Sequence, residues 1–355
     1  MSKSPTRHLT ALTAAQVNTL LAVAVIGAVV TGLVSWAVGT EWARLWTFLH
    51  AAFGVMVLVL TPAKANGSVR VGLRRGRTSR WVSLIFAGLI LAIIVLGLLH
   101  GTGLWYGVGY WTSLWTHFLL AFVAVPLLLW HMLARPVRTR AVNLDRRMFL
   151  GGGVAAGIAA TTVGAVELGT RAVGAAGGDR RFTGSHEIGS FDPQAMPVVS
   201  WINDRRPTLD PDDWPFTVGG IPVDLDPLRG RVRAVEAALD CTGGWWSNQS
   251  WDVISFTELF ESIEPVGDLD PRAEVDRARS VLVRSATGYQ RLFPLTDADQ
   301  TFLAFGYNRE PLRRGHGAPV RIVAPGRRGP WWVKWVTEIE LSDRRWWLQL
   351  PFPAD

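Results

Sequence analysis

The first half of the chain contains several apolar runs, each long enough to cross a lipid bilayer as a helix. A helical span needs about 20 mostly apolar residues, because the hydrocarbon core of a bilayer is about 30 Å thick. Five segments satisfy this requirement: 17–38, 43–61, 81–99, 112–133 and 148–166. The fifth is rich in Gly and Ala, small residues that let membrane helices approach closely. The sequence therefore predicts an all-α transmembrane bundle of five spans within residues 1–172.

Positive charge is concentrated in two of the connections between these spans. The connections carry Lys64, Arg70, Arg74, Arg75, Arg77 and Arg80, and Arg135, Arg138, Arg140, Arg146 and Arg147. Cytoplasmic loops carry the excess of Lys and Arg, so both connections are expected in the cytoplasm and the chain after about Arg171 outside it. If the fifth segment does not span, that second half is cytoplasmic instead. The net charge of +7 is thus typical of a membrane protein, and no nucleic-acid partner is expected.

The sequence Asp145-Arg146-Arg147-Met148-Phe149-Leu150 precedes the fifth segment. It resembles the twin-arginine export signal, in which paired arginines precede a weakly apolar stretch. Such a signal implies that the second half folds and takes up a cofactor in the cytoplasm before it crosses the membrane. The alternative is ordinary positive charge on the inner side.

Four histidines lie in or at the ends of the apolar segments, namely His50, His100, His117 and His131. Ionisable residues within a membrane are costly and tend to be functional. His50 and His117 lie at similar depths below the outer ends of their spans. Two neutral imidazoles at one depth can bind the iron of a b-type haem, in a layout that resembles small cytochrome b anchors. His100 is an alternative outer ligand, and His131 has no partner at its depth, so one haem is expected at most. The other interpretation is that these histidines bond across helices or lie at the interface.

From about Gly178 onward the chain is polar and contains short runs typical of strands. Examples are 216–218, 281–284 and 320–323, and only 232–239 and 256–262 suggest helix. This pattern predicts a strand-dominated α+β domain over 214–355, joined to the membrane half by a linker over 173–213. The single cysteine, Cys241, excludes an intramolecular disulfide.

Two blocks of this second half carry a family resemblance. The first is Ala238-Leu239-Asp240-Cys241-Thr242-Gly243-Gly244, followed by Trp251-Asp252-Val253 and Phe256-Thr257-Glu258-Leu259-Phe260. The second comprises Tyr307-Asn308-Arg309-Glu310-Pro311-Leu312, then residues 316–326 and 333–341. In their order and spacing these blocks, which fall within about 214–342, resemble the sulfite oxidase family of molybdopterin enzymes.

The resemblance implies that the Cys241 thiolate binds molybdenum, a role that suits a soft sulfur donor. It also implies that His316, Arg321 and Lys334 hold the pterin and its phosphate. Tyr289 is a further candidate at the pocket. The alternatives are a small buried thiol for Cys241 and a solvated basic surface for the cations, since Arg313, Arg314, Arg327 and Arg328 are nearby in the sequence.

The chain also departs from this family. Sulfite-oxidising relatives follow the cysteine with an asparagine and with arginines that bind an anionic substrate, whereas Trp245, Trp246 and Ser247 follow here. No tyrosine follows Lys334, where those relatives carry a catalytic one. These departures favour a less charged substrate than sulfite, such as a sulfoxide, an N-oxide or an oxidised side chain.

Together these features predict a membrane-anchored molybdopterin oxidoreductase that acts on a small molecule outside the cytoplasm. It would exchange electrons with a b-type haem, a quinone or a redox protein. One alternative is an electron-transfer subunit whose haem bundle does the work and whose outer domain only binds a partner. Another is an anchored recognition module that keeps the fold but binds no metal.

Overall fold

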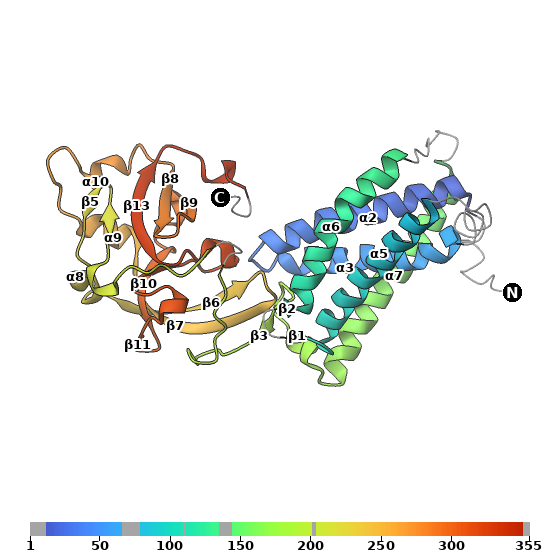
Figure 1. Cartoon of the computed structure of the whole chain (residues 1–355), viewed down its shortest axis with the longest axis horizontal. Coiled ribbons are helices and arrows are strands. Elements are labelled where there is room, and N and C mark those ends of the chain that lie inside the picture. Colours follow the sequence, from blue (N-terminus) through green and yellow to red (C-terminus); the bar gives the residue numbers. More distant parts are fainter. Residues whose placement is uncertain (1–11, 66–78, 109–110, 135–143, 201–203, 351–355) are drawn as a thin grey trace. The chain divides into compact units, whose positions relative to one another are not determined.

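The computed structural model describes residues 12–65, 79–108, 111–134, 144–200 and 204–350. The chain divides into two compact units, Met1–His186 and Glu187–Asp355. Figure 1 shows the first unit as long helices, in blue to green, and the second as a strand-rich domain, in yellow to red. Most of both Arg-rich connections (66–78 and 135–143) lies outside the described residues, so the orientation across a membrane stays a prediction.

Long helices make up most of the first unit. They are α2 (Ala14–Ala37), α3 (Ala43–Lys64), α5 (Ser79–Thr102), α6 (Ser113–Ala134) and α7 (Arg146–Ala172). Among the described residues, these five helices are long and apolar enough to cross a membrane. The five predicted helices are thereby confirmed, and their spanning rests on length and composition. The short strands β1 (Gly107–Val108) and β2 (Trp111–Thr112) pair just before α6.

Several helices extend beyond their predicted ends, as α3 and α7 illustrate. Helix α3 continues through Pro62 to Lys64, and α7 runs on from 166 to Ala172. Asp145 precedes α7, and its carboxylate accepts a hydrogen bond from the Met148 N–H at 2.9 Å. The paired arginines therefore form the first turn of α7 directly after an N-cap. Whether they also act as an export signal stays a prediction.

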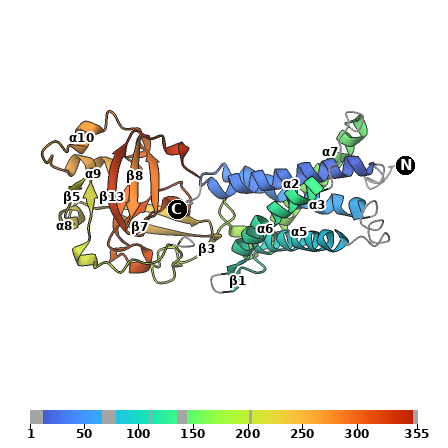
Figure 2. The same cartoon turned by 45° about the horizontal axis from the view of Figure 1, so that its top comes forward.

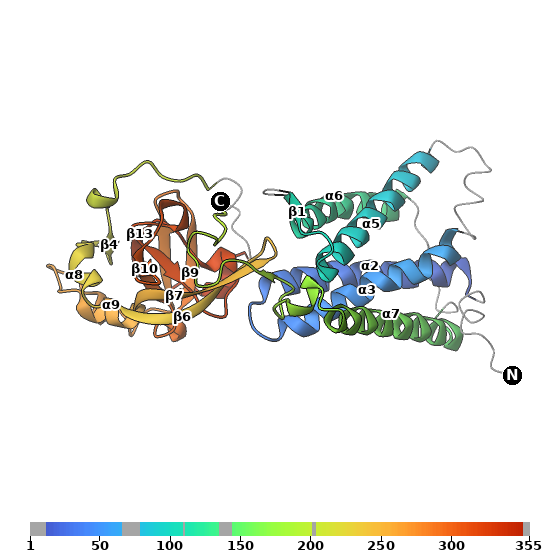
Figure 3. The same ribbon diagram turned by 90° about the horizontal axis from the view of Figure 1, so that it is seen from below.

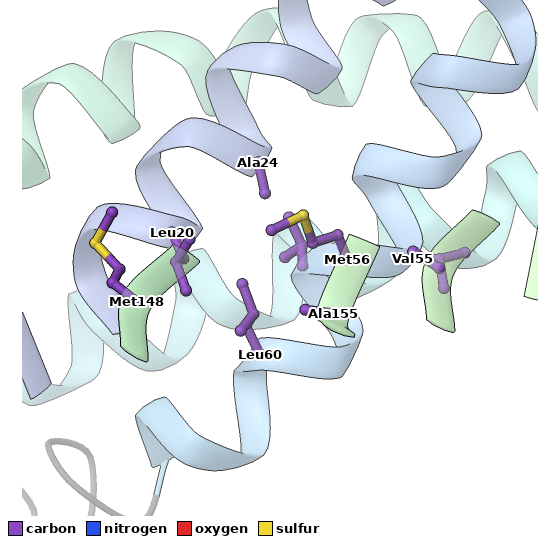
Figure 4. Packing of buried hydrophobic residues seen from close by; sticks show 9 residues of the cluster. Leu20, Ala24, Val55, Met56, Leu60, Met148 and Ala155 are labelled. Carbon is purple, nitrogen blue, oxygen red and sulfur yellow. The ribbon is translucent and has the colours of Figure 1, made fainter. Parts of the chain in front are cut away.

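A buried cluster joins α2, α3 and α7, which run alongside one another in Figure 3. Figure 4 shows how Leu20, Leu60 and Met56 pack against the small residues of α7. A Cβ atom on Gly152 would lie 2.8 Å from Leu20 Cδ2, so glycine lets the leucine side chain pack closely against α7. Ala155 and Ala159 on the same helix are fully buried. The expectation that the fifth segment packs through small residues is confirmed.

The second unit is built on two sheets, whose strands are seen in Figure 2. The six-stranded sheet has the order β11-β10-β7-β3, with β12 also paired to β10 and β6 to β7, and the five-stranded sheet has the order β5-β4-β13-β8-β9. The strands of the first sheet are β3 (His186–Glu187), β6 (Arg233–Cys241), β7 (Trp245–Ser255), β10 (Phe302–Tyr307), β11 (Glu310–Pro311) and β12 (Arg321–Val323). Those of the second are β4 (Thr217–Val218), β5 (Ile221–Pro222), β8 (Ser280–Ser285), β9 (Gln290–Pro294) and β13 (Val336–Ser342).

Short helices complete this unit, namely α8 (Leu225–Arg229), α9 (Phe256–Ser262) and α10 (Pro271–Glu274). The prediction of a strand-dominated α+β domain is confirmed, and so is the helix predicted over 256–262. Part of the segment expected to be a linker (173–213) is bound to the sheet. The Gly189 carbonyl accepts hydrogen bonds from Ser247 Oγ at 2.9 Å and Gln249 Nε2 at 2.7 Å.

The helix predicted over 232–239 is wrong, because these residues form strand β6. The run Arg-Ala-Val-Glu-Ala-Ala-Leu is rich in good helix formers, which misled the prediction. In the structure β6 pairs along its whole length with β7, from Arg233 opposite Val253 to Cys241 opposite Trp245. Ala237 and Leu239 point to the buried side. Pairing with a long neighbouring strand therefore outweighs local helix propensity.

Candidate metal centres

Cys241 is the last residue of β6 and lies at the end of the β6–β7 hairpin. The turn Thr242-Gly243-Gly244 follows it, and Gly244 takes φ +92°, which favours glycine. The Gly244 N–H donates to the Cys241 carbonyl at 3.1 Å, and the Gly243 N–H donates to Cys241 Sγ at 3.3 Å. Cys241 is a free cysteine of intermediate exposure. The hairpin thus presents one sulfur atom at its end.

Trp245 is the cross-strand neighbour of Cys241, so both side chains lie on one face of the sheet. Its side chain is only 4% exposed, yet its indole N–H has no hydrogen-bond partner among the described residues. A Cβ atom on Gly243 would lie 3.5 Å from Cys241 Sγ and 3.9 Å from Trp245 Nε1. The glycine therefore leaves a space that borders both the sulfur and an unused donor.

A buried ion pair lies directly behind the thiol. Arg328 Nη1 is 2.9 Å from Asp240 Oδ1, and both side chains are 3% exposed. Arg328 Nη2 also donates to the Cys241 carbonyl at 3.2 Å. Arg328, one of the arginines near the pterin-binding candidates in the sequence, is therefore paired inside the domain with the residue before the cysteine. Sequence reasoning missed this role, and the acidic neighbour Asp240 was the available signal.

Burial raises the pKa of the Cys241 thiol, and the charge of Asp240 acts in the same direction. The Gly243 N–H, Arg328 and Lys334 act in the opposite direction. The metal-free protein therefore holds a neutral thiol whose surroundings already favour the thiolate in part. A bound cation would complete the deprotonation.

The three residues predicted to bind a pterin lie together. Gly317, the neighbour of His316, has a φ of +109° and packs between the other two residues. A Cβ atom on Gly317 would lie 3.0 Å from Arg321 Cβ and 3.2 Å from Lys334 Cβ. Arg321 is 1% exposed and donates to the carbonyls of His316, Trp332 and Ile322 at 2.8, 3.3 and 3.3 Å. These bonds use three of its five N–H groups. Arg321 therefore organises the segment around His316 as well as carrying charge.

His316 and Lys334 are also bonded to the chain. His316 Nε2 donates to the Met196 carbonyl at 3.2 Å, and its Nδ1 accepts from the Tyr307 hydroxyl at 2.9 Å. Burial and the neighbouring cations lower the pKa of His316 to about 3, so the ring is neutral near pH 7. Lys334 Nζ donates to the Val199 and Gly315 carbonyls at 2.9 and 2.6 Å. Burial, followed by repulsion from Arg321, lowers the pKa of Lys334 to about 7.

Tyr289, the further candidate at the pocket, is bonded to the backbone near Arg328, and its role at the pocket stays a prediction. Its hydroxyl donates to the Pro330 carbonyl at 2.5 Å. Burial raises the pKa of the phenol further above its ordinary value. The side chain therefore ties down the segment next to Arg328, which is a supporting role.

In the first unit, His50 on α3 and His117 on α6 face each other. Their ring centres are 5.8 Å apart with an angle of 82° between the planes. His50 Nδ1 donates to the Ala28 carbonyl at 2.8 Å and His117 Nδ1 to the Ile93 carbonyl at 2.7 Å. Since carbonyls only accept, each Nδ1 carries the proton and each Nε2 keeps its lone pair in the neutral ring. This is the arrangement of a histidine prepared to bind a metal.

Two glycines make room for these rings. A Cβ atom on Gly32 of α2 would lie 2.8 Å from His50 Nδ1, and one on Gly97 of α5 would lie 3.3 Å from His117 Nδ1. Metal–imidazole bonds are about 2 Å long, so two rings on one iron have centres roughly 6 Å apart. The residues present therefore fit a bis-histidine iron site.

The other two histidines of the helices have different surroundings. His100 Nε2 is 3.0 Å from the Gly184 carbonyl, and its Nδ1 is 3.3 Å from Ser113 Oγ. Both of its ring nitrogens are therefore engaged, unlike those of the His50–His117 pair. His186, which sequence reasoning missed, lies with its ring centre 4.8 Å from that of His100. His131 stacks on Phe86 at 5.8 Å.

Among the described residues no group of three or more His, Cys, Asp or Glu side chains could hold a metal ion. Any metal at Cys241 or between His50 and His117 would thus need most of its donors from a cofactor. At Cys241 the free thiol and the unused Trp245 donor, both close to the side-chain position of Gly243, fit such a group. The pterin-binding candidates supply cations on a separate segment.

Comparison with known proteins agrees with this arrangement. Residues 203–347 match the family described as the oxidoreductase molybdopterin binding domain. The mitochondrial sulfite oxidase of Drosophila melanogaster is 27% identical over 164 residues, which is 39% of this chain and 29% of that protein. The nitrate reductase [NADPH] of Mycosarcoma maydis is 50% identical over 42 residues, which is 12% of this chain and 4% of that protein.

Among solved structures, the sulfane dehydrogenase SoxCD from Paracoccus pantotrophus aligns with a TM-score of 0.33 and 22% identity. The alignment covers 39% of this chain and 40% of that one. The chain thus spans less than a third of the length of the curated relatives it matches.

The second unit therefore carries a molybdopterin-binding oxidoreductase domain, and the predictions of an oxidoreductase enzyme and of a molybdopterin cofactor are confirmed at this level. The match includes Cys241, the His316–Lys334 segment and Arg328. The haem, the quinone, the membrane sidedness and the substrate lie outside what these comparisons address.

Proposed function

We propose that this protein is a membrane-anchored, molybdopterin-dependent oxidoreductase in which the Cys241 thiolate is a ligand of molybdenum. The observation that carries the proposal is the free thiol at the end of the β6–β7 hairpin, beside the space left by Gly243 and within the matched domain. When bound, the cofactor supplies two-electron or oxygen-atom chemistry. The chain's own residues bind it, orient it and control access to it.

Each cation of the second unit has a separable role in this proposal. Lys334 uses two of its three N–H groups on carbonyls, which leaves one for an anionic group of the pterin. Arg321 stabilises the surrounding segment and has two N–H groups beyond its three bonds to carbonyls. His316 is neutral near pH 7, so it contributes position and hydrogen bonding and no charge.

The proposal extends to the first unit. His50 and His117 would bind one b-type haem iron through their Nε2 atoms, and the five apolar helices would anchor the protein in the membrane. A haem supplies one-electron transfer. Electrons would pass between it and the second unit, with a quinone or redox protein as the other partner. Positive charge in the connections supports an extracytoplasmic second unit.

The substrate we propose is an uncharged oxygen-bearing molecule such as a sulfoxide or an N-oxide. The guanidinium of Arg328 donates to the Cys241 carbonyl. Its charge is neutralised by Asp240 in a buried pair. Trp245, which pairs with Cys241 on the same face of the hairpin, is an uncharged side chain. An uncharged substrate matches these surroundings better than sulfite does.

A Cys241→Ser variant tests the proposal in detergent-purified protein. Changes to outer partners of metal ligands cost 10–100-fold, so replacement of the ligand itself is expected to lower oxidoreductase activity by more than about 100-fold. Metal analysis reports molybdenum per chain, and the absorption spectrum reports haem independently. Equal molybdenum and equal activity in the variant and the wild type would contradict the proposal. A haem spectrum without molybdenum in the wild type would favour the alternative of an electron-transfer subunit with a non-catalytic outer domain.

A further inference from the structure

Trp245 has a buried donor that the protein itself does not use. Its side chain is 4% exposed, and no acceptor among the described residues lies within hydrogen-bonding reach of its indole N–H. Leaving a buried donor unpaired is costly, so such groups are rare in native structures unless they have a ligand or a water to bond. By contrast, the indole N–H groups of Trp251 and Trp335 donate to the Ala237 and Arg314 carbonyls at 2.9 and 2.8 Å.

The position of this donor points to a ligand at the thiol. The atoms of Trp245 closest to the space at Gly243 are Cδ1 and Nε1, both 3.9 Å from where a Cβ atom would be. Cys241 Sγ lies 3.5 Å from the same point. The cross-strand pairing of Cys241 with Trp245 holds their two side chains on one face of the hairpin. A ligand atom that accepts a hydrogen bond from this indole N–H would therefore lie on the same side of the hairpin as the sulfur.

The cations nearby, Arg328 and Lys334, indicate what kind of molecule this is. Lys334 Nζ already donates to the Val199 and Gly315 carbonyls. The Arg328 guanidinium is balanced by Asp240 and bonded to the Cys241 carbonyl, so it offers no net positive charge. An indole N–H is a donor only and cannot accept. It therefore favours a molecule with an exposed, uncharged oxygen acceptor, and a site built around such a donor discriminates against analogues that lack the acceptor.

We propose that Trp245 is a specificity-determining residue whose indole N–H donates a hydrogen bond to the oxygen of an uncharged S=O or N–O substrate beside Cys241. This inference rests on the proposed function, since it places the substrate next to the metal ligand. Trp245, the first residue of β7, would thus bind an uncharged substrate where a cationic side chain would bind an anion.

The test uses the full-length protein in detergent, loaded with molybdenum and labelled with 5-fluorotryptophan. Trp245→Phe keeps an apolar ring and removes only the N–H, and the line missing from its ¹⁹F spectrum assigns Trp245. Dimethyl sulfoxide is the probe, and dimethyl sulfide, which lacks the oxygen, is the matched control ligand. We expect the Trp245 line to shift with dimethyl sulfoxide and not with dimethyl sulfide. Trp347→Phe, at a residue that is 55% exposed, is the control variant.

Kinetics give a second measurement. We expect Trp245→Phe to raise the KM for dimethyl sulfoxide by about tenfold, equivalent to about 1.4 kcal/mol, with a smaller change in kcat. Trp347→Phe is expected to change neither. If Trp245→Phe does not fold, Trp245→Tyr provides the assignment and the KM.

The outcomes separate the two proposals. A molybdenum-loaded wild type whose Trp245 line does not respond to dimethyl sulfoxide overturns the role of Trp245 and leaves the enzyme proposal intact. An unchanged KM in the variant has the same meaning. A wild type that binds no molybdenum when the cofactor is supplied contradicts the proposed function itself. If the Trp245 line of that protein still shifts with dimethyl sulfoxide, the oxygen-binding role of Trp245 holds without the metal.

Discussion

The two candidate metal centres prepare their donors in opposite ways. In the first unit, His50 and His117 each donate from Nδ1 to a backbone carbonyl of a neighbouring helix. This bond fixes the ring and leaves Nε2 available. In the second unit, Cys241 Sγ accepts a hydrogen bond from the Gly243 N–H of its own turn. The helices hold a pair of donors at a set separation, whereas the hairpin presents a single donor at its end.

This difference reflects what each unit can supply. Helix backbones place side chains at regular depths, so two imidazoles 5.8 Å apart need only two helices and two opposing glycines. A hairpin end has fewer neighbours, and its surroundings come from distant segments such as Arg328 and Lys334. The pair His50 and His117, here called the helical centre, should therefore be sensitive to single contacts across helices. The site at Cys241, here called the hairpin centre, should be sensitive to the loss of its one sulfur ligand.

The largest effect that distinguishes the centres is expected from the histidines. Replacing either His50 or His117 with alanine removes one of two axial donors, and we expect haem content per chain to fall by more than about tenfold. Molybdenum per chain should stay unchanged, because Cys241 belongs to the other unit. His131→Ala is the matched control, since that ring stacks on Phe86. Full haem content in both single variants would remove this pair as the haem site.

The sequence could place His50 and His117 on the same level because helices are periodic, whereas a haem between them stays a prediction. Counting residues from the ends of two apolar runs placed His50 and His117 at similar depths, and in the structure their rings face each other. The same counting left His100 as an alternative. It could not show that both nitrogens of His100 are bonded, because one partner, Gly184, lies 84 residues away in the chain.

The hairpin centre was only partly predictable. Cys241, His316, Arg321 and Lys334 were recognised through their motifs, and the last three lie together around Gly317. The strand that carries the cysteine was predicted as a helix, because pairing with β7 is not visible in local propensity. The partnership of Arg328 with Asp240 and the unused donor of Trp245 depend on contacts between segments, which no spacing rule supplies.

A smaller effect is expected at the glycines opposite the histidines. Gly32→Ala places a methyl group 2.8 Å from His50 Nδ1, so the ring must move and its bond to Ala28 is disturbed. Gly97→Ala gives a milder contact of 3.3 Å with His117. We expect haem content to fall more in the first variant than in the second, as measured by the absorption spectrum. Gly54→Ala and Gly88→Ala, where nothing lies within 4 Å, are the controls and should keep full haem. Equal retention in all four variants would show that the rings do not depend on this clearance.

The smallest effect concerns the buried charge of the second unit. The pKa of Lys334 is lowered to about 7, whereas an unfolded lysine titrates near 10.4. Between these values the unfolded state binds more protons, so Lys334 makes folding stability increase with pH across this window. Lys334→Met removes this titration. In metal-free protein, we therefore expect the Tm of the wild type minus that of the variant to increase from pH 7 to pH 10. A difference that stays constant over this range would mean that Lys334 keeps its ordinary pKa and carries a full charge beside Arg321, and the hairpin centre would then be more strongly cationic than its contacts indicate.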